Sequence, residues 1–405
     1  MSAFALSVYG ACGLIVAIHV TLLIGGTRVR VRDWRAARHA TAAGGSGSEQ
    51  PALAPGLPVS VVVAARDEEH TLPPLLRSLE QQLSPDFEVV LVNDRSADGT
   101  AAIMQEFARR RPATIVVDNS DEPVGCNGKQ HALDLGVAAA SGELLLFTDA
   151  DCELPPTWVD QHAARFADRR VAAVFGALAV RAGRKLVERY QAYDQALVHQ
   201  YSTGTAGVGV PTGCFGNNLA VRSGALASVG GFRALGFTPT EDAALLAALQ
   251  RTGLAVTATA SVGTAIVTAP QTSWRAFLDQ HVRWNSGAFY GDGVVGRWSY
   301  RYVVLFLVAS ILLAPLAAWW SQLALLPLTS FTVIALLGAF AAGSLRRGAA
   351  AGGSRISVLG TAFRVVAYTP LFMGFYALAT VLAMAGVRPS WKGRRLQRAR
   401  VGQRG

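Results

Sequence analysis

Two aspartates separated by one residue, Asp149 and Asp151, stand where an apolar run ends in the segment LLLFTDADCELP. In extended backbone, side chains two positions apart point to the same side, so the two carboxylates could address one cation or one diphosphate. Acidic residues beside prolines also form solvated turns that have no chemistry. The pair therefore indicates catalysis only if a sheet, a nucleotide site and a base surround it.

Short apolar segments alternate with amphipathic ones between residues 58 and 149. The predicted strands are 58–65, 87–94, 113–118 and 142–149, and the predicted helices are 71–83, 98–110 and 129–140. Strands rich in β-branched residues between helices predict a mostly parallel sheet covered on both faces. Such sheets hold ligands at the carboxyl ends of their strands, where this chain has AARDEE, NDRSADGT and TDAD.

Acidic residues also stand near the starts of two predicted helices. Asp94 follows the apolar run of its strand, whereas Asp98 stands where a helix cap is expected. Farther along, TEDAALLAALQ predicts a helix with Thr240 as N-cap and with Glu241 and Asp242 in its first turn. Acids there complement the helix dipole, so a purely structural role for Asp242 stays open beside a role as general base.

Four apolar runs in the 405-residue chain are long enough to cross about 30 Å of hydrocarbon as helices, namely 3–26, 302–320, 322–343 and 365–386. Arginines follow the first run, whereas a secretory signal has its basic residues before the apolar core. We therefore expect a retained anchor with its N-terminus outside and the chain from residue 28 onward in the cytoplasm. Three full crossings near the other end would leave the basic tail outside, whereas an interfacial or re-entrant segment would leave it inside, and both topologies stay open.

The net charge of +10 is divided unevenly along the chain. Residues 301–405 contain twelve Lys or Arg and no Asp or Glu, residues 1–41 carry +4, and residues 42–300 therefore carry −6. Positive charge beside the apolar runs suits anionic lipid headgroups, and a negative middle segment argues against a nucleic-acid-binding domain. The four cysteines have neither C-x-x-C spacing nor histidines at zinc-ligand spacing, so they predict no disulfide framework and no structural zinc.

These features predict six segments. They are an N-terminal transmembrane helix (1–27), a basic juxtamembrane segment with a flexible linker (28–57), a catalytic domain (58–270), an interfacial helix (271–300), C-terminal membrane helices (301–387) and a basic tail (388–405). Within the fourth segment, WRAFLDQHVRWNSGAF has aromatic residues at helical spacing, which is typical of an amphipathic helix at a membrane surface.

Several segments occur in the order found in a known family. Over roughly residues 58–290 the chain resembles the membrane-bound bacterial family 2 glycosyltransferases, which have the GT-A fold. The resemblance is carried by VSVVVAARDEEHTL, VLVNDRSADGT, GKQHALDLGVAAASGELLLFTDADCELP, GNNLAVRSGALASVGGF, TEDAALLAALQRTG and QHVRW. Each segment is weak alone, and the ordered set is specific. It implies an α/β, Rossmann-like GT-A catalytic domain with a mostly parallel sheet, flanked by N- and C-terminal transmembrane helices.

The resemblance implies a site for a nucleotide sugar. It places Asp94 against the uridine of a UDP-sugar and Lys129 near the nucleotide, with the backbone near Ala64 and the side chain of Glu68 around the base and ribose. Arg66 departs from the family pattern, in which an aromatic residue often stacks on uracil, although a guanidinium can also stack.

The same resemblance assigns the reacting groups. Asp149 lies near the ribose and the metal, and Asp151 binds a divalent cation, Mg²⁺ or Mn²⁺, that neutralises the leaving diphosphate. Asp242 matches the base that deprotonates the acceptor for an inverting attack at the anomeric carbon. The T-E-D and Q-x-x-R-W motifs supply the remaining residues, with Arg283 near the diphosphate and with Glu241, Gln280 and Trp284 in the acceptor site.

We therefore predict an inverting glycosyltransferase that moves a sugar from a nucleotide sugar to a membrane lipid at the cytoplasmic face of a bacterial-type inner membrane. A processive polysaccharide synthase is the alternative, which the modest number of apolar runs disfavours. A non-catalytic nucleotide-sugar-binding membrane protein would tolerate loss of the base or of the metal ligand, and the sequence keeps both. A nucleotidyltransferase would have a glycine-rich basic loop after its first strand, where AARDEEHTL is acidic and contains no glycine.

Overall fold

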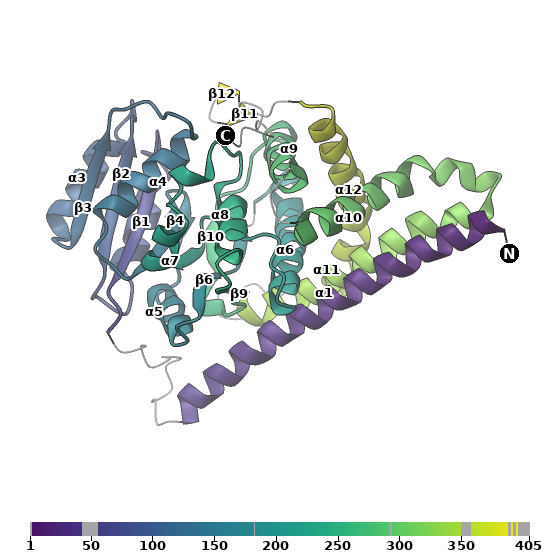
Figure 1. Cartoon of the computed structure of the whole chain (residues 1–405), viewed down its shortest axis with the longest axis horizontal. Coiled ribbons are helices and arrows are strands. Elements are labelled where there is room, and N and C mark those ends of the chain that lie inside the picture. Colours follow the sequence, from purple (N-terminus) through teal and green to yellow (C-terminus); the bar gives the residue numbers. More distant parts are fainter. Residues whose placement is uncertain are drawn as a thin grey trace. The chain divides into compact units, whose positions relative to one another are not determined.

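A seven-stranded sheet contains the four strands that were predicted between residues 58 and 149 (Figure 1). The strands are β1 (Val59–Ala65), β2 (Glu88–Asp94), β3 (Thr114–Asn119), β4 (Leu144–Asp149), β6 (Val171–Phe175), β8 (Leu219–Arg222) and β9 (Ala255–Ala258). Their order is β3-β2-β1-β4-β8-β6-β9, and β3, β2, β1 and β4 run parallel. β8 pairs antiparallel with both of its neighbours, and β6 pairs parallel with β9. The prediction of a mostly parallel α/β sheet is therefore confirmed.

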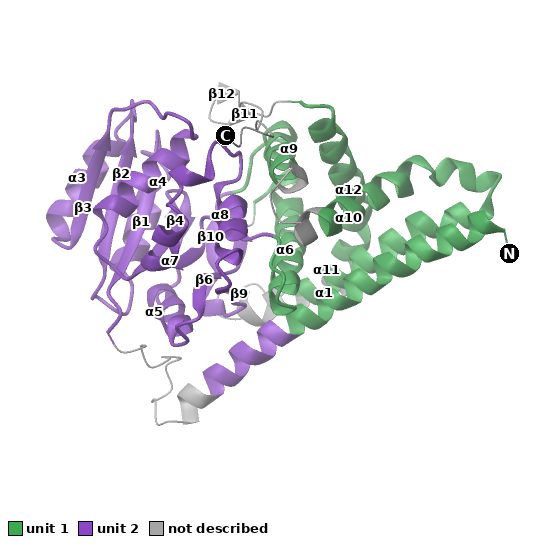
Figure 2. Cartoon of the chain, viewed as in Figure 1, with its two compact units in different colours: residues 1–27, 180–212, 270–405 green, residues 28–179, 213–269 purple. Residues whose placement is uncertain are grey.

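The computed structural model describes residues 2–42, 56–181, 183–290, 294–349, 358–387, 390–391 and 394–395. The chain forms two compact units, which Figure 2 distinguishes by colour. Unit 1 consists of residues 1–27, 180–212 and 270–405, and unit 2 consists of residues 28–179 and 213–269. The sheet belongs to unit 2.

The core of unit 2 forms where the sequence is continuously apolar. Val61, Val62 and Val63 of β1 have no exposed surface, as expected for a strand that has neighbours on both edges and helices on its faces. One helix approaches the sheet closely, because a Cβ at Gly136 would lie 2.5 Å from a methyl of Val62. The helices of this unit are α2 (Leu72–Glu80), α3 (Thr100–Arg110), α4 (Gly128–Ala139), α5 (Trp158–Ala163), α7 (Ser223–Ser228) and α8 (Glu241–Gln250).

The two aspartates at the end of the fourth predicted strand do not share one strand. β4 ends at Asp149, and Ala150 and Asp151 form a turn that leads into β5 (Cys152–Glu153). β5 pairs antiparallel with β10 (Ile266–Thr268), which joins it to β7 (Leu178–Val180) in a small second sheet. The expectation of extended backbone through the pair was therefore wrong, because the chain turns there to enter this second sheet.

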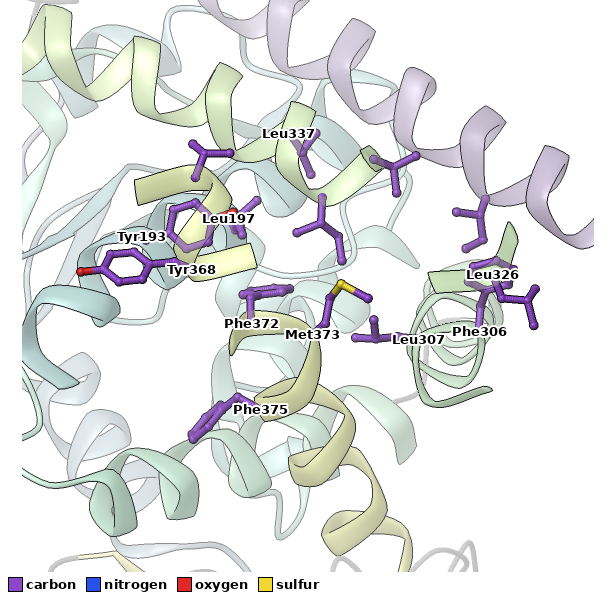
Figure 3. Packing of buried hydrophobic residues seen from close by; sticks show 14 of the residues in the cluster. Tyr193, Leu197, Phe306, Leu307, Leu326, Leu337, Tyr368, Phe372, Met373 and Phe375 are labelled. Atoms are coloured by element: carbon purple, nitrogen blue, oxygen red, sulfur yellow. The ribbon is translucent and has the colours of Figure 1, made fainter. Parts of the chain in front are cut away.

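Unit 1 is built from helices around a continuous apolar core. Figure 3 shows part of this core, in which Leu197, Phe306, Leu337 and Phe372 gather from four different helices. The helices are α6 (Leu186–Gly207), α9 (Trp274–Tyr290), α10 (Val294–Leu312), α11 (Leu325–Ala349) and α12 (Val358–Met384), together with the first part of α1 (Ala3–Ala42).

Three stretches in the described part of the chain are long and apolar enough to cross a membrane: Ala3–Arg38, Ser321–Ala342 and Ala362–Met384. The run 302–320, predicted to span as well, does not form one helix. α10 ends at Leu312 and gives way to a short 3₁₀ helix, Ala314–Ala318. Proline at position 315 has no amide hydrogen for an α-helical bond, which accounts for the break.

The first helix is longer than the predicted anchor. α1 continues without a break through the predicted boundary at residue 27 and ends at Ala42. The basic segment that follows the apolar run is therefore part of the same helix. Most of the predicted linker (43–55) and most of the basic tail (388–405) lie outside the residues that the structure describes.

Candidate active site

The parallel register brings together the carboxyl ends of three strands that are distant in sequence. Ala64 of β1 pairs with Val92 of β2 on one side and with Asp149 of β4 on the other. Asp94, at the end of β2, pairs with Asn119 of β3. The structure thus gathers Ala64, Asp94 and Asp149 at one edge of the sheet, the edge at which open α/β sheets hold their ligands.

Asp94 is buried and already surrounded by hydrogen-bond donors. Its Oδ1 accepts from Arg95 Nε at 2.9 Å and from Asn119 Nδ2 at 2.8 Å, and Arg66 Nη1 lies 4.0 Å from its Oδ2. Arg95 has a φ of +57°, an uncommon conformation for a residue other than glycine. Such backbone outliers cluster at functional sites. Sequence reasoning had missed Arg95 and Asn119, because neither belongs to a periodic pattern.

The loop after β1 is tied to the start of α3. The Glu68 amide donates to Thr100 Oγ1 at 2.8 Å, and its carboxylate accepts from the Thr71 hydroxyl. Asp98 lies one residue before the N-cap Gly99 rather than at the cap, and it accepts from the amide of Thr100 at 3.0 Å. The two loops that border Asp94 therefore hold each other in place.

Lys129 links two parts of unit 2 that carry predicted site residues. Its Nζ lies 2.8 Å from Asp149 Oδ1 at the end of β4 and 3.1 Å from Glu241 Oε1 at the start of α8. Burial alone would lower the pKa of Lys129, but the facing carboxylates outweigh burial and raise that pKa. Lys129 follows the first residue of α4, whose N-cap Asn127 forms a capping box with Gln130. The lysine is thus a firmly held cation between two carboxylates.

Asp151 is a largely buried carboxylate with few donors. Thr268 Oγ1 donates to its Oδ2 at 3.2 Å, and burial, together with the nearby carboxylates of Asp149 and Glu68, raises the pKa of Asp151 to about 6. Among the described residues, no three His, Cys, Asp or Glu side chains gather as a metal site made by protein alone. Asp149 and Asp151 can therefore hold a hard divalent cation only if other oxygen ligands, such as phosphate, complete its coordination.

Asp242 is held by two backbone amides. Its Oδ2 accepts from the amide of Gly216 at 3.0 Å, and its Oδ1 accepts from the amide of Ala243 at 2.8 Å. Burial and the adjacent Glu241 raise the pKa of Asp242, although Lys129 acts in the opposite direction. A carboxylate that is oriented, partly buried and more basic than usual has the properties of a general base.

Asn218, which the sequence gave no reason to single out, fixes the segment that contains Gly216. Its Oδ1 accepts from the indole of Trp158 and lies 2.9 Å from His162 Nε2. Its Nδ2 donates to the carbonyls of Ala177 at 2.7 Å and of Thr264 at 2.8 Å. Asn218 is fully buried with its hydrogen-bonding capacity used, so the backbone that holds Asp242 is firmly placed.

The remaining predicted residues lie in unit 1. Gln280, Arg283 and Trp284 are on α9, and all three side chains are partly exposed. The predicted helix of the Q-x-x-R-W motif is therefore present. Trp284 packs against His281, with the ring centroids 5.0 Å apart.

Comparison with known proteins places the chain in a class. The profile described as glycosyl transferase family 2 matches residues 60–226, and the one described as glycosyl transferase family group 2 matches residues 144–346. The second match covers half of the chain, and the chain belongs to the family 2 glycosyltransferases. It is thus an enzyme of the glycosyltransferase class.

Individual relatives match over shorter stretches. The chain is 35% identical over 112 residues to the undecaprenyl-phosphate 4-deoxy-4-formamido-L-arabinose transferase of Pseudomonas fluorescens. This match covers 26% of this chain and 32% of that protein. It is 38% identical over 96 residues to the 4,4'-diaponeurosporenoate glycosyltransferase of Staphylococcus haemolyticus, and this match covers 24% of each protein. The matched region thus spans a third or less of the length of these relatives.

A solved structure extends the likeness of the fold over most of the chain. The mannosyltransferase PcManGT of Pyrobaculum calidifontis, solved in complex with GDP-Man and Mn²⁺, superimposes with a TM-score of 0.50. The superposition covers 92% of this chain and 99% of that protein, at 19% sequence identity. At this identity the likeness concerns the fold, which is GT-A.

Proposed function

We propose that this chain transfers a sugar from a UDP-sugar to a lipid or lipid-linked acceptor, with inversion at the anomeric carbon. The observation that carries the proposal is the arrangement around Lys129, which joins Asp149 at the end of β4 to Glu241 beside Asp242. Through Lys129, the residue proposed to bind the sugar donor, Asp149, is linked to the helix start that carries the proposed base, Asp242.

The donor would bind at the carboxyl edge of the sheet. Asp94, the backbone of Ala64 and the side chain of Glu68 would surround the base and ribose, and Lys129 and Arg283 would contact the phosphates. The donors around Asp94, namely Arg95, Asn119 and Arg66, support a polar planar ligand there, because they can hydrogen-bond the carbonyl oxygens of a base.

The donor set at Asp149 and Asp151 fits a divalent cation. Burial and the neighbouring carboxylate of Asp149 both raise the pKa of Asp151, and a hard cation would relieve the repulsion between the two carboxylates. Mg²⁺ and Mn²⁺ both prefer carboxylate and phosphate oxygens. When bound, such an ion would neutralise charge on the departing diphosphate.

Asp242 would act as the general base. Its carboxylate would accept the proton of the acceptor hydroxyl while that oxygen attacks the anomeric carbon from the side opposite the diphosphate. The amides of Gly216 and Ala243 hold the carboxylate in one orientation, which supports a positioned base. Because the attack occurs in one displacement, the configuration of the anomeric carbon inverts and no sugar is attached to the enzyme.

A lipid acceptor is supported by two independent observations. The matched relatives are named for transfer to undecaprenyl phosphate and to diaponeurosporenoate, both of which are lipids. The described chain also has three helices of membrane-spanning length and composition. Gln280 and Trp284 of α9, with Glu241, would line the acceptor site. The arginines that follow the first apolar run support a cytoplasmic catalytic unit in an inner membrane of bacterial type.

The test combines a lipid comparison with a donor assay. Lipids from a host that expresses the chain are compared by mass spectrometry with lipids from a host that expresses the Asp242→Asn variant, and a lipid heavier by one sugar residue is expected only in the former. Purified protein is then titrated with UDP, GDP and TDP. Tighter binding of GDP or TDP would refute the uridine assignment, and a ladder of many added sugars would favour the processive alternative over single transfer.

A further inference from the structure

A fully buried contact between an acid and a histidine lies in unit 1, and neither residue belongs to the proposed active site. Asp194 of α6 and His281 of α9 are 1% and 0% exposed, and His281 Nε2 lies 3.1 Å from Asp194 Oδ2. Tyr190 donates from its hydroxyl to the other carboxylate oxygen at 3.5 Å. Polar groups of this kind are costly to bury, so their presence in an aromatic core calls for a physical explanation.

The contact holds one proton whose place the geometry restricts. His281 Nδ1 lies 3.1 Å from the carbonyl of Phe277, which can only accept, so Nδ1 carries a hydrogen. At Nε2 one further proton must lie between the ring and Asp194, either on the imidazole or on the carboxyl group. In both cases the pair as a whole is neutral, which allows it to be buried, and its hydrogen bonds fix the plane of the imidazole ring.

The ring that is fixed in this way supports Trp284. His281 packs against Phe277, Phe375, Tyr376 and Trp284, with ring centroids 4.3, 5.0, 5.1 and 5.0 Å away. Phe375 is one of the aromatic residues drawn in Figure 3. Phe277 and Phe375 are buried, whereas Tyr376 and Trp284 are partly exposed. The imidazole is therefore the buried surface on which the Trp284 indole rests.

A second polar contact lies one helical turn away and holds the same helix from other sides. Asn285 Oδ1 accepts from Tyr300 of α10 at 2.6 Å and from Thr380 of α12 at 3.0 Å, and its Nδ2 donates to the carbonyl of His281 at 2.8 Å. Together, His281 and Asn285 tie α9 to α6, α10 and α12. Hydrogen bonds are directional, so bonds on three sides of α9 restrict its rotation and sliding.

We propose that Asp194 and His281 are positioning residues that hold the indole of Trp284, and with it the acceptor side of the site. The inference rests on the proposed function, in which Trp284 lines the acceptor site. It assigns no contact with a substrate to either residue of the pair. Asp194 acts through His281, and His281 acts through its ring contact with Trp284.

The test uses the full-length chain in lipid nanodiscs and begins with a readout that needs no substrate. Asp194→Ala removes the partner of Nε2, and hydroxyl-radical labelling of Trp284, measured by mass spectrometry, should rise severalfold. Asp194→Asn serves as the rescue variant, because its amide can donate to the unprotonated Nε2 of the tautomer that Phe277 requires. Labelling of Trp284 in this variant should stay close to that of the unaltered chain. Ser310→Ala is the matched control, since it removes a buried 2.8 Å contact with Ser330 elsewhere in the same unit, and it should leave labelling unchanged.

The kinetic arm then measures the Michaelis constants for both substrates. Loss of the buried hydrogen bond in Asp194→Ala should raise the KM for the lipid acceptor about tenfold and leave the KM for the nucleotide sugar unchanged. In a Trp284→Ala background, Asp194→Ala should have no further effect on the KM for the lipid acceptor, because the indole through which Asp194 acts has been removed.

The possible results separate the two proposals. The positioning role would be overturned if Asp194→Ala left the labelling of Trp284 unchanged. It would also be overturned if Asp194→Ala and Trp284→Ala raised the KM for the lipid acceptor by independent factors that multiply in the double variant. If the unaltered chain transfers no sugar to any lipid, the proposed function fails, and the labelling experiment still decides whether the pair holds Trp284.

Discussion

Replacing Asp242 with asparagine separates a general base from an acid that only complements a helix dipole. The two amides that hold Asp242 make the change more informative than the sequence suggested. Asparagine has a single side-chain oxygen, so one of the donors, Gly216 or Ala243, must lose its acceptor. We expect the side chain to keep its place, because the other amide still binds that oxygen.

The expected effects on stability and on turnover differ in size. Leaving one backbone amide without its acceptor costs about 1–3 kcal/mol, and removing a partly buried charge beside Glu241 offsets part of that cost. Loss of the proton acceptor should lower the rate of transfer about 10²-fold or more. If Asp242 has only a structural role, turnover should stay nearly intact at a similar cost in stability, because the same amide loses its acceptor.

The assay measures three quantities on each variant in the same detergent. They are the rate of sugar transfer to an identified acceptor, the affinity for UDP by calorimetry, and the unfolding temperature. Asp134→Asn is the matched control, because Asp134 Oδ1 also accepts a backbone amide, that of Phe232 at 2.8 Å, outside the proposed site. This control should lose stability to a similar degree and retain transfer.

Two results would refute the reasoning. Normal turnover of Asp242→Asn would remove this residue from the mechanism. Loss of turnover together with loss of UDP binding would point to a collapsed site, because the nucleotide contacts are assigned to Asp94, Lys129, Asp149 and Asp151. Retained UDP affinity with lost transfer is the outcome that identifies the base.

Three further predictions follow from the charges in unit 2 and from the anchor. Lys129→Met removes a positive charge that lowers the pKa of Asp242, so that pKa should rise and the acid limb of the pH profile for transfer should move to higher pH; an unmoved limb would contradict the coupling. EDTA or Asp151→Ala should abolish transfer, with Mg²⁺ or Mn²⁺ restoring activity only to the unaltered chain, and the affinity for Mn²⁺ should weaken below about pH 6 as Asp151 takes up its proton. Full activity of Asp151→Ala in EDTA would disprove the metal assignment. A reporter fused after residue 50 should be cytoplasmic, because five arginines follow the first apolar run, and labelling from outside would reverse the topology; a second reporter after residue 400 decides the side of the tail.

The edge of the sheet could be predicted because parallel strands share one polarity. Once the strands of Ala64, Asp94 and Asp149 were recognised, their carboxyl ends had to lie together, and the register confirms this. The turn at Asp151 could not be predicted in the same way. It depends on pairing between β5 and β10, which are more than a hundred residues apart and too short for a periodic signal.

Polar residues that hold the predicted site residues in place through hydrogen bonds were the main omission. Asn218 and Arg95 stand next to residues that the family motifs drew attention to, yet nothing in their own type or spacing indicates this supporting role. Asn218 matters because β8 inserts antiparallel between β4 and β6, which brings its side chain against the carbonyls of Ala177 and Thr264. Such positions follow from the tertiary arrangement rather than from local pattern.

The end of α10 shows how an apolar composition can mislead. Residues 302–320 are apolar enough for a membrane span, and hydropathy alone gives no reason to divide them. Proline at position 315 is a local signal that disfavours a continuous helix, and the structure has a break there. The topology prediction therefore needed backbone chemistry as well as hydropathy.

The arginine-rich segment after the first apolar run contains one buried acid, whose role the net charge of the segment does not indicate. Asp33, the single acid among five arginines, is 7% exposed and belongs to unit 2. Its Oδ2 accepts from Thr259 Oγ1 at 2.9 Å and from the amide of Ala260 at 2.7 Å, and Arg165 Nη1 lies 3.0 Å from its Oδ1. The basic segment is thus packed into unit 2, so it is more than a signal for membrane orientation.

This packing gives the last prediction, which concerns stability. Asp33→Ala would leave Arg165, largely buried, without its carboxylate partner, and breaking a buried pair on one side costs about 3–5 kcal/mol. Because Arg165 keeps some contact with water, we expect a loss of about 2–3 kcal/mol, measured as the fall in unfolding temperature of the full-length chain. Asp168→Ala is the matched control, since it breaks an exposed pair with Arg170 and should change the unfolding temperature little. Equal effects of the two substitutions would mean that the contact of Asp33 with Arg165 contributes no more than a surface ion pair, and that other contacts hold the basic segment within unit 2.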